Sequence, residues 1–201
     1  MRIRVLPTLL AMLSALFPAA AYADGPAPVE IPSVRVPQVD IPGAEVPIVD
    51  VPGTELPIID APGITVPGIE VREGEGIALI RMAGDVLFDF DKSDIRPDAA
   101  TALNEVLALI GSRYPDADFT IHGHTDAMGS HSYNMRLSQA RSEAVRDWLI
   151  ANGVAADRMS IQAHGESRPI APNANADGSD NPAGRALNRR VEIAVALPGD
   201  R

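Results

Sequence analysis

Asp126 and Arg141 are the two residues whose charges and surroundings best suit them to binding a small ligand. Asp126 directly follows an apolar segment, and Arg141 stands about two turns into the amphipathic segment that comes next. A guanidinium can bind both oxygens of a carboxylate, and an aspartate can bind an ammonium group. The pair would therefore suit a ligand that carries both charges on one carbon. An internal ion pair that stabilises the turn would use the same two residues, and their spacing leaves both interpretations open.

The segments around this pair have the periodicity of a strand followed by a helix. Residues 119–122 alternate apolar and polar side chains, as a half-buried strand does. Residues 130–151 have helical periodicity, and Asn152-Gly153 is a typical helix end. One stripe of this helix comprises Asn134, Leu137, Ser138, Arg141, Val145 and Leu149. We expect the apolar members in the core, and Asn134 and Ser138 beside Arg141, bonded to a ligand or to the turn.

The remaining pattern predicts one domain of the α/β (α+β) class. Strands are predicted at 85–90, 119–122, 159–164 and 191–197, with a short strand at 77–82 and a further helix over 99–110. We therefore expect a two-layer sandwich, in which helices pack on one face of a mixed four-stranded sheet in the order β-α-β-α-β-β. Residues 169–184 are rich in Asn, Asp, Gly and Pro, which predicts a polar loop.

A pentapeptide repeat occupies residues 31–70. Its eight copies are IPSVR, VPQVD, IPGAE, VPIVD, VPGTE, LPIID, APGIT and VPGIE. A proline at every fifth position excludes a continuous helix and biases the preceding residue toward extended backbone. We therefore expect an extended, polyproline-like segment with type II turns at its four Pro-Gly pairs. It would serve as a semi-rigid linker or as an arm that binds a partner protein.

The first 23 residues have the organisation of a secretory signal peptide. Two arginines among the first four residues precede a largely apolar run, and residues 21–23 (Ala-Tyr-Ala) form a typical cleavage site. The chain is therefore predicted to contain a signal peptide (1–23), a Pro-rich arm (24–72) and a folded domain (73–201). The sequence has no cysteine, which excludes disulfides and thiol chemistry.

The charge of the chain argues against nucleic acid as a partner. Without the signal peptide, 15 basic residues stand against 27 acidic residues, which gives a net charge of −12. Binding to nucleic acid depends on a basic footprint that neutralises phosphates. An acidic balance of this size mainly favours solubility.

Residues 119–149 resemble the signature of the OmpA-like peptidoglycan-binding domain family. An apolar strand is followed by G-H-T-D-x-x-G and then by Y-N-x-x-L-S-x-x-R-x-x-x-V-x-x-x-L. The matching residues are Gly123, His124, Thr125, Asp126, Gly129, Tyr133, Asn134, Leu137, Ser138, Arg141, Val145 and Leu149. The resemblance extends over about 85–197. It implies an α/β sandwich whose ligand is the bacterial cell wall.

The resemblance also implies which residues of this chain bind peptidoglycan. Asp126 and Arg141 match the residues that hold the diaminopimelate of the peptide stem in the family. Phe90 and Asp91 match an F-x-F-D segment that borders the pocket. Arg189, in the N-R-R-V-E segment, would meet a ligand carboxylate or pair with an acidic residue across the sheet. The complete predicted site is Asp126, Arg141, Asp91, Phe90, Asn134, Ser138 and Arg189.

Signals for metal binding are weaker. His122 and His124 alternate on a strand, which suggests a zinc site, but no carboxylate or cysteine cluster completes it. Residues 173–181 are faintly similar to a calcium loop, but Gly184 stands where the acidic residue of the twelfth position belongs. We therefore expect neither a metal nor another cofactor.

The sequence predicts a binding module and no enzyme. It contains no nucleophile elbow, metal-hydrolase motif or phosphate loop, although Asp91 and Asp126 would be the residues for acid–base chemistry on the wall. We expect non-covalent peptidoglycan binding in the periplasm or cell envelope, near the outer membrane. The alternative is an envelope interaction protein whose arm, residues 31–70, carries the main function by binding an outer-membrane or periplasmic protein.

Overall fold

The structure, a computed structural model, describes residues 56–74 and 76–197. The predicted signal peptide and the repeats before Leu56 lie outside the described residues, as do two of the four predicted Pro-Gly turns. Within the described ranges, no helix combines the length and the apolar character that crossing a membrane requires.

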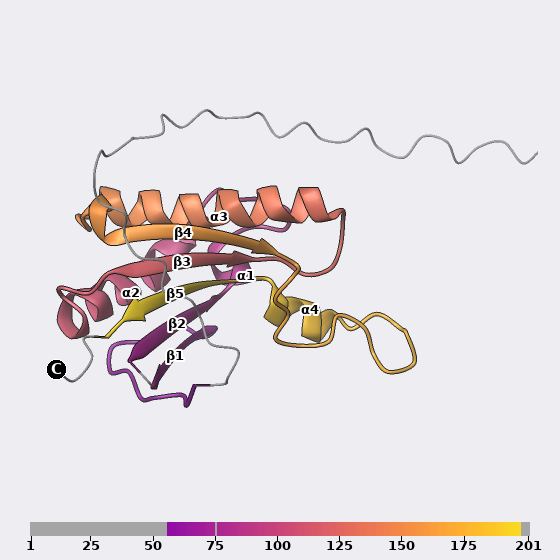
Figure 1. The fold of residues 1–201 in the computed structure, drawn as a ribbon, viewed down its shortest axis with the longest axis horizontal. Helices are drawn as coiled ribbons and strands as arrows, with labels where there is room; N and C mark the ends of the chain where they lie inside the picture. The colour runs from indigo at the N-terminus through magenta and orange to yellow at the C-terminus, as the bar shows by residue number, and fades with distance from the viewer. Residues whose placement is uncertain (1–55, 75, 198–201) are drawn as a thin grey trace, which may run out of the picture. The chain divides into compact units, whose positions relative to one another are not determined.

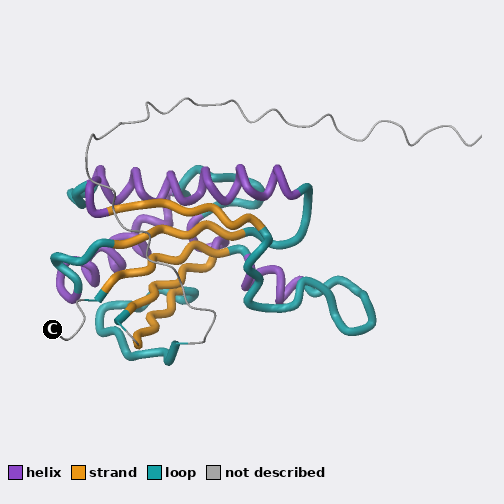
Figure 2. The backbone as a smooth tube through the Cα atoms, viewed as in Figure 1, coloured by secondary structure: helices purple, strands orange, loops and turns teal. Residues whose placement is uncertain are grey.

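A mixed five-stranded sheet forms the centre of the domain (Figures 1 and 2). The strands are β1 (Ile69–Gly74), β2 (Ile77–Ala83), β3 (Phe119–His124), β4 (Met159–Gly165) and β5 (Arg190–Ala196), in the spatial order β1-β2-β5-β3-β4. Strands β3 and β4 are parallel, and all other neighbours are antiparallel. As a result, β2, β3 and β4 finish at the end of the sheet where β5 begins.

Two long helices and several short ones connect the strands. They are α1 (Gly84–Leu87), η1 (Pro97–Ala99), α2 (Ala100–Arg113), α3 (His131–Ala151), η2 (Ala156–Arg158) and α4 (Pro182–Asn188). The start of α3 agrees with the prediction, because the Ser130 hydroxyl accepts a hydrogen bond from the backbone N–H of Tyr133 at 3.2 Å. Helix α3 lies very close to β3, since a Cβ added to Gly123 would be 2.1 Å from the carbonyl oxygen of Ser138.

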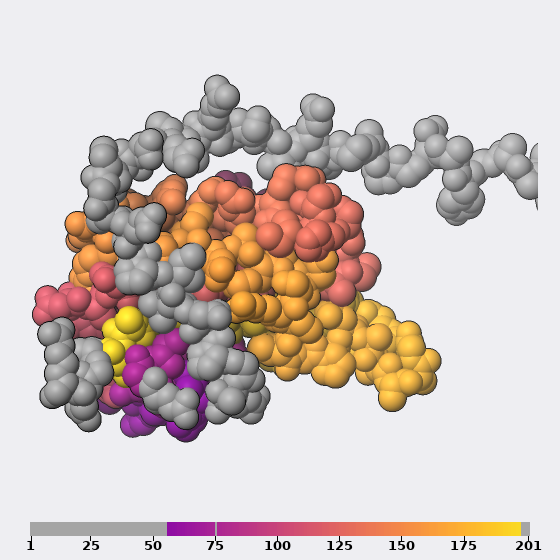
Figure 3. Space-filling view, in the orientation of Figure 1, coloured from indigo at the N-terminus to yellow at the C-terminus, as the bar shows by residue number. Residues whose placement is uncertain are grey.

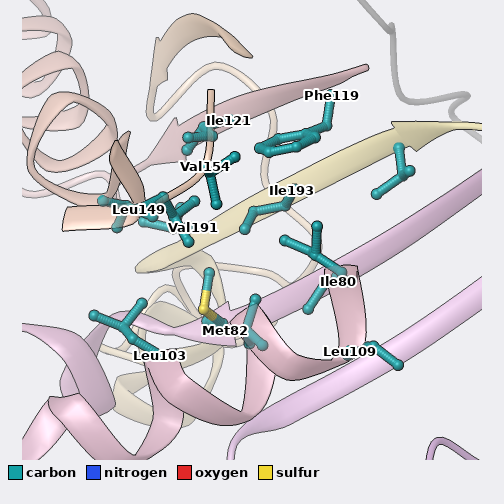
Figure 4. Close-up of a cluster of buried hydrophobic side chains, with 14 of the residues drawn as sticks. Ile80, Met82, Leu103, Leu109, Phe119, Ile121, Leu149, Val154, Val191 and Ile193 are labelled. Atoms are coloured by element: carbon teal, nitrogen blue, oxygen red, sulfur yellow. The ribbon is translucent and has the colours of Figure 1, made fainter. Parts of the chain in front are cut away.

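The hydrophobic core lies between the sheet and the helices α2 and α3 (Figure 4). Alternate strand residues supply the sheet side of the core: Ile80 and Met82, Phe119 and Ile121, and Val191 and Ile193. Leu103 of α2 and Leu149 of α3 pack onto this layer and are fully buried. Their burial removes apolar surface from water, which is the main force that holds the two layers together.

Polar side chains of β3 and β5 project to the opposite face of the sheet and form a buried charged network. Glu192 is 2% exposed and accepts hydrogen bonds from Nε of Arg81 at 2.8 Å and from Nε of Arg190 at 2.9 Å. Nε2 of His124 lies 3.2 Å from the same carboxylate. These contacts compensate the cost of burying the charges, and they lower the pKa of Glu192 although burial alone would raise it.

The last three repeats pack against the domain. The fourth residues of these repeats, Ile59, Ile64 and Ile69, contact the main core, and the first residue Leu56 packs with Ile77, Leu79 and Ala194 on the opposite face. The backbone of residues 57–59 extends the sheet beyond β1, because Ile59 N–H donates to Val71 and Glu73 N–H donates to Pro57. The folded part therefore begins before the predicted boundary at residue 73.

One predicted type II turn is confirmed in these repeats. The N–H of Ile64 donates to the carbonyl of Ala61 at 3.0 Å, and Gly63, the third residue of the turn, has a φ of 100°. Such a turn needs a positive φ at its third position, which glycine adopts without strain. The predicted combination of extended backbone and Pro-Gly turns therefore holds at residues 57–64, and the packing of residues 56–69 against the domain is a feature that the prediction did not include.

The predicted two-layer sandwich, with a mixed sheet and helices on one face, is confirmed, but two of its details are wrong. The sheet has five strands, because β1 is recruited from the end of the repeat. The predicted strand at 85–90 is the helical turn α1 followed by a single bridge between Phe88 and Ile95. A short apolar run does not distinguish a strand from a helical turn, and here the chain must leave the sheet after β2.

Candidate functional site

The candidate site lies at the end of the sheet where β2, β3 and β4 finish, near the labels α1 and α4 in Figure 1. His124, the last residue of β3, lies opposite Arg190, the first residue of β5. Asp126 follows β3, Asp85 follows β2, and Arg189 precedes β5. The strand register therefore brings these three charged residues together from distant parts of the sequence.

Asp126 is almost fully engaged by neighbouring donors. Its side chain is 8% exposed. Oδ1 accepts a hydrogen bond from the backbone N–H of Met128 at 3.0 Å, and Oδ2 accepts from Nη1 of Arg185 at 3.3 Å and Nη1 of Arg189 at 3.1 Å. A carboxylate offers about four acceptor positions, so these contacts leave about one position free.

The two arginines that contact Asp126 are each held by an aspartate of their own. Nε and Nη2 of Arg189 donate to Asp85 at 3.2 and 2.8 Å. Nε and Nη2 of Arg185 donate to Asp180 at 2.8 and 2.6 Å. These hydrogen bonds raise the pKa of both arginines. The guanidinium of each arginine is therefore held in place by its own aspartate, and its Nη1 points toward the same oxygen of Asp126.

Arg141 is a buried cation without an anionic partner among the described residues. It is 4% exposed, and its Nε donates to the backbone carbonyl of Lys92 at 2.9 Å. The guanidinium carbon lies 5.1 Å from the centroid of the Phe88 ring, a cation–π arrangement. Burial and the nearby positive charge of Arg189 lower the pKa of Arg141. A carboxylate from a ligand would relieve both effects.

The loop that follows α1 forms one side of the site. Asp91 has a φ of 61°, an unusual value for a residue other than glycine. Its carboxylate accepts a hydrogen bond from the Tyr133 hydroxyl. Burial and this contact raise the pKa of Tyr133 to about 12. The neighbouring Phe90 is 85% exposed, so its ring is available to a ligand or partner.

Asn134 and Ser138 hold different positions in the helix α3. Ser138 is fully buried, and its hydroxyl donates to Met135 at 2.9 Å and accepts from the N–H of Gly165 at 3.0 Å. Ser138 therefore joins α3 to the end of β4. Asn134 is 1% exposed, and its side chain interacts with the carboxylate of Glu166.

Two ion pairs that the sequence left open are different in the structure. Asp126 and Arg141 form no direct ion pair in the described part of the chain, and Asp126 pairs with Arg185 and Arg189 instead. Arg189 pairs with Asp85 and Asp126. Glu192 pairs with Arg190 of its own strand and with Arg81 of the neighbouring strand β2.

Three histidines form a buried stack on this face of the sheet. Nδ1 of His122 lies 2.9 Å from Nε2 of His164, and the rings of His124 and His164 are stacked with centroids 4.8 Å apart. No group of three or more potential ligands is placed to hold a metal anywhere in the described ranges. In the loop that is similar to a calcium site, Asp177 bonds Ser179 and Asp180 bonds Arg185.

Arg185 was not predicted as a site residue, because no helix was predicted between the loop at 169–184 and the strand at 191–197. The signal for a helix is nevertheless present: Asn181 caps α4 by accepting from the N–H of Gly184 at 3.0 Å, and Pro182 occupies the first turn. A helix here places Arg185 and Arg189 four residues apart and hence on the same side. The loop before α4 projects from the rest of the domain in Figure 3.

Known proteins similar to this chain share this domain. The model of the OmpA family matches residues 87–182. Outer membrane porin F of Pseudomonas aeruginosa is 42% identical over 118 residues, which are 58% of this chain and 32% of the porin. The probable lipoprotein YiaD of Escherichia coli K12 is 38% identical over 130 residues, which are 64% of this chain and 56% of the lipoprotein.

A solved structure has the same fold. It is the cell wall anchor of the T6SS from Pseudomonas aeruginosa, with a TM-score of 0.55 and 28% identity, and the match covers 65% of this chain and 89% of that structure. The chain spans a third to just over half of the length of the two curated relatives (32% and 56%). The resemblance predicted from the motif is confirmed, and residues 87–182 of this chain form a domain of the OmpA family.

Proposed function

We propose that this chain binds peptidoglycan non-covalently through the diaminopimelate of the peptide stem, and that it thereby anchors or organises the cell envelope. The far end of diaminopimelate carries an ammonium and a carboxylate on one carbon. The candidate site contains the carboxylates of Asp85 and Asp126 and the guanidiniums of Arg141 and Arg189. Arg189 contacts both carboxylates, and Arg141 lies near enough to Arg189 for the two charges to interact. These charges complement both groups of the ligand.

The observation that carries this proposal is the state of Arg141. Burial of an unpaired charge costs several kcal/mol in real proteins. Among the described residues, Arg141 contacts the Lys92 carbonyl and the Phe88 ring and forms no ion pair. A ligand carboxylate between Arg141 and Arg189 would supply the missing negative charge, and the ligand ammonium would lie toward Asp126.

The comparisons support the wall as the ligand. One similar solved structure is named as a cell wall anchor, and the relatives are named as an outer membrane porin and a lipoprotein. We infer a periplasmic or envelope location near the outer membrane, and a further interaction with an outer-membrane or periplasmic protein through residues 31–70. The predicted signal peptide is consistent with that location.

The proposal is tested by sedimentation of the purified protein with isolated diaminopimelate-type peptidoglycan. Asp126→Asn is expected to reduce the affinity by about tenfold or more, because it removes a charged contact worth about 1.5–3 kcal/mol. Arg141→Lys is also expected to reduce the affinity, because lysine keeps the charge but cannot bind both oxygens of a carboxylate with a planar fork. Asp147→Asn and Arg146→Lys are matched controls: these residues pair with each other on α3 at 2.8 Å, outside the site. The controls should sediment like the parent.

The proposal fails if the parent protein stays in the supernatant. It also fails if Asp126→Asn and Arg141→Lys sediment as well as their controls do. Circular dichroism spectra of all four variants must match the spectrum of the parent, so that a loss of binding is not a loss of folding. Peptidoglycan with lysine in place of diaminopimelate lacks the carboxylate beside the ammonium, and we expect it to bind more weakly.

A further inference from the structure

Arg185 and Arg189 make the same pattern of contacts around Asp126. Each uses Nε and Nη2 on a private aspartate, Asp180 or Asp85, and each donates Nη1 to Oδ2 of Asp126. Two charged donors therefore converge on a single carboxylate oxygen. A ligand ammonium that approaches Asp126 finds Oδ2 already occupied and about one acceptor position free on the carboxylate, so more than one hydrogen bond from the ammonium to Asp126 requires the arginines to move.

The hydrogen-bond lengths of Arg185 indicate that its contact with Asp126 breaks more easily than its contacts with Asp180. Its two bonds to Asp180 are 2.6 and 2.8 Å long, in the range of strong charge-assisted hydrogen bonds, whereas its contact with Asp126 is 3.3 Å long. Arg185 keeps a carboxylate partner when it leaves Asp126. The exchange of this one contact is therefore inexpensive, provided that Nη1 finds another acceptor.

Ligands of different charge would meet this arrangement differently. A ligand with only an ammonium displaces Nη1 of Arg185 and Nη1 of Arg189 from Asp126 and leaves both donors without an acceptor. A ligand with an adjacent carboxylate offers both donors a new acceptor while its ammonium takes their place on Asp126. Donors that lose their acceptor are unfavourable, so the arrangement disfavours the first ligand and not the second.

We propose that Arg185 is a specificity-determining residue: with Arg189 it occupies Asp126 until a ligand that carries a carboxylate beside its ammonium exchanges partners with both arginines. The inference rests on the proposed function, because it concerns the same site. It adds a reason for selectivity between stem peptides that end in a zwitterion and stem peptides that end in an amine alone.

Arg185 has little part in holding the fold. Its side chain is 18% exposed and that of Asp180 is 56% exposed, and ion pairs at the surface contribute little to stability. Helix α4 has its own cap at Asn181. Substitution of Arg185 is therefore expected to leave the domain folded and to change what it binds.

The experiment compares two synthetic stem tripeptides, Ala-Glu-diaminopimelate and Ala-Glu-lysine, by isothermal titration calorimetry with the purified protein. The parent is expected to prefer the diaminopimelate peptide. In Arg185→Gln the lysine peptide should bind more tightly than to the parent, and the diaminopimelate peptide should bind equally or more weakly. The ratio of the two affinities should fall by about tenfold. Arg146→Gln removes the same charge elsewhere on the domain and should keep the parental ratio.

Arg185→Lys separates geometry from charge. It keeps a cation near Asp126 but cannot hold Asp180 with a fork while it donates to Asp126, so its ratio should lie between those of the parent and Arg185→Gln. The inference is overturned if the parent binds the diaminopimelate peptide but Arg185→Gln keeps the parental ratio. Failure of the parent to bind that peptide at all would instead refute the proposed function.

Discussion

At the scale of single residues, the main feature of this domain is that some buried charges have partners of opposite charge and others do not. Glu192 is surrounded by Arg81, Arg190 and His124, and Asp126 has two guanidiniums of its own. Arg141 has a carbonyl and a ring. A cation–π contact contributes about 0.5–2 kcal/mol, which is less than the cost of burying the charge. The imbalance falls at the position where a ligand carboxylate would bind.

The histidine stack predicts how the stability of the domain depends on pH. Burial lowers the pKa of His124 to about 4 and that of His164 to about 3, whereas an unfolded chain has a histidine pKa of about 6.5. Below about pH 6.5 the unfolded state binds more protons, so the free energy of unfolding falls as the pH is lowered toward about 4. Urea unfolding at a series of pH values measures this slope.

The window above about pH 5 isolates the histidines, because ordinary carboxylates titrate near pH 4. His164→Gln removes one of the two groups and should make the pH dependence shallower in that window. A free energy of unfolding that stays constant between about pH 7 and pH 5 would show that neither imidazole is held neutral by burial.

At the scale of elements, the end of the repeat is part of the folded domain. Each of its last three copies places its fourth residue on the core, and the carboxylate of Glu105 on α2 accepts the backbone N–H of Thr65 at 2.8 Å and of Val66 at 3.0 Å. A hydrogen bond from the Thr65 hydroxyl, together with these two backbone bonds, lowers the pKa of Glu105, and the hydroxyl contributes most. A five-residue period with a turn at Pro-Gly therefore repeats inward-facing positions, although it forms neither a helix nor a regular strand.

Leu56 and Ile58 provide a matched test of this packing. Leu56 is 6% exposed and Ile58 is 61% exposed, although both belong to the same repeat. Leu56→Ala is expected to lower the free energy of unfolding by about 2 kcal/mol, the lower end of the range for large-to-small core substitutions. Ile58→Ala should change it by less than about 0.5 kcal/mol. Equal effects in urea unfolding would mean that the repeat does not pack through its first position.

At the scale of the whole molecule, the repeat divides into two parts with different expected roles. Residues 56–70 contribute to the sheet and the core, and β1 starts at Ile69. Residues 31–55 share the same sequence pattern, and they are the part to which we assign a linker or arm function. The acidic balance of the chain, 17 basic against 27 acidic residues, disfavours a polyanion as a partner.

Two deletions distinguish these parts. Removal of residues 31–55 is expected to leave peptidoglycan sedimentation and the free energy of unfolding close to those of the parent. Removal of residues 31–70 also deletes Leu56 and the first two residues of β1, and it should destabilise the domain by several kcal/mol, in line with the loss of more than one core side chain. If the shorter deletion abolishes sedimentation, the arm and not the pocket carries wall binding.

Local patterns in the sequence were sufficient to predict α3 and its buried stripe. Helical periodicity, the Ser130 cap and the Asn152-Gly153 end all act within one or two turns, and they place Arg141 in the buried stripe. The family motif around Asp126 is equally local. Local signals failed at 85–90, where a short apolar run between two aspartates fits a strand or a helical turn. They also failed in the repeat, because proline spacing does not reveal which residues will pack on a core.

The tertiary structure alone decided the partners of the charged residues. Asp85 and Arg189 lie 104 positions apart, and Asp126 and Arg185 lie 59 positions apart. These pairs meet because antiparallel pairing of β5 with β2 and β3 aligns the start of one strand with the ends of two others. The sequence by itself was sufficient to identify the family and to select Asp126 and Arg141 as candidate ligand-binding residues. The strand register placed Arg185 and Arg189 on Asp126 and left Arg141 without an anion, because ion pairing depends on distances that only the assembled sheet sets.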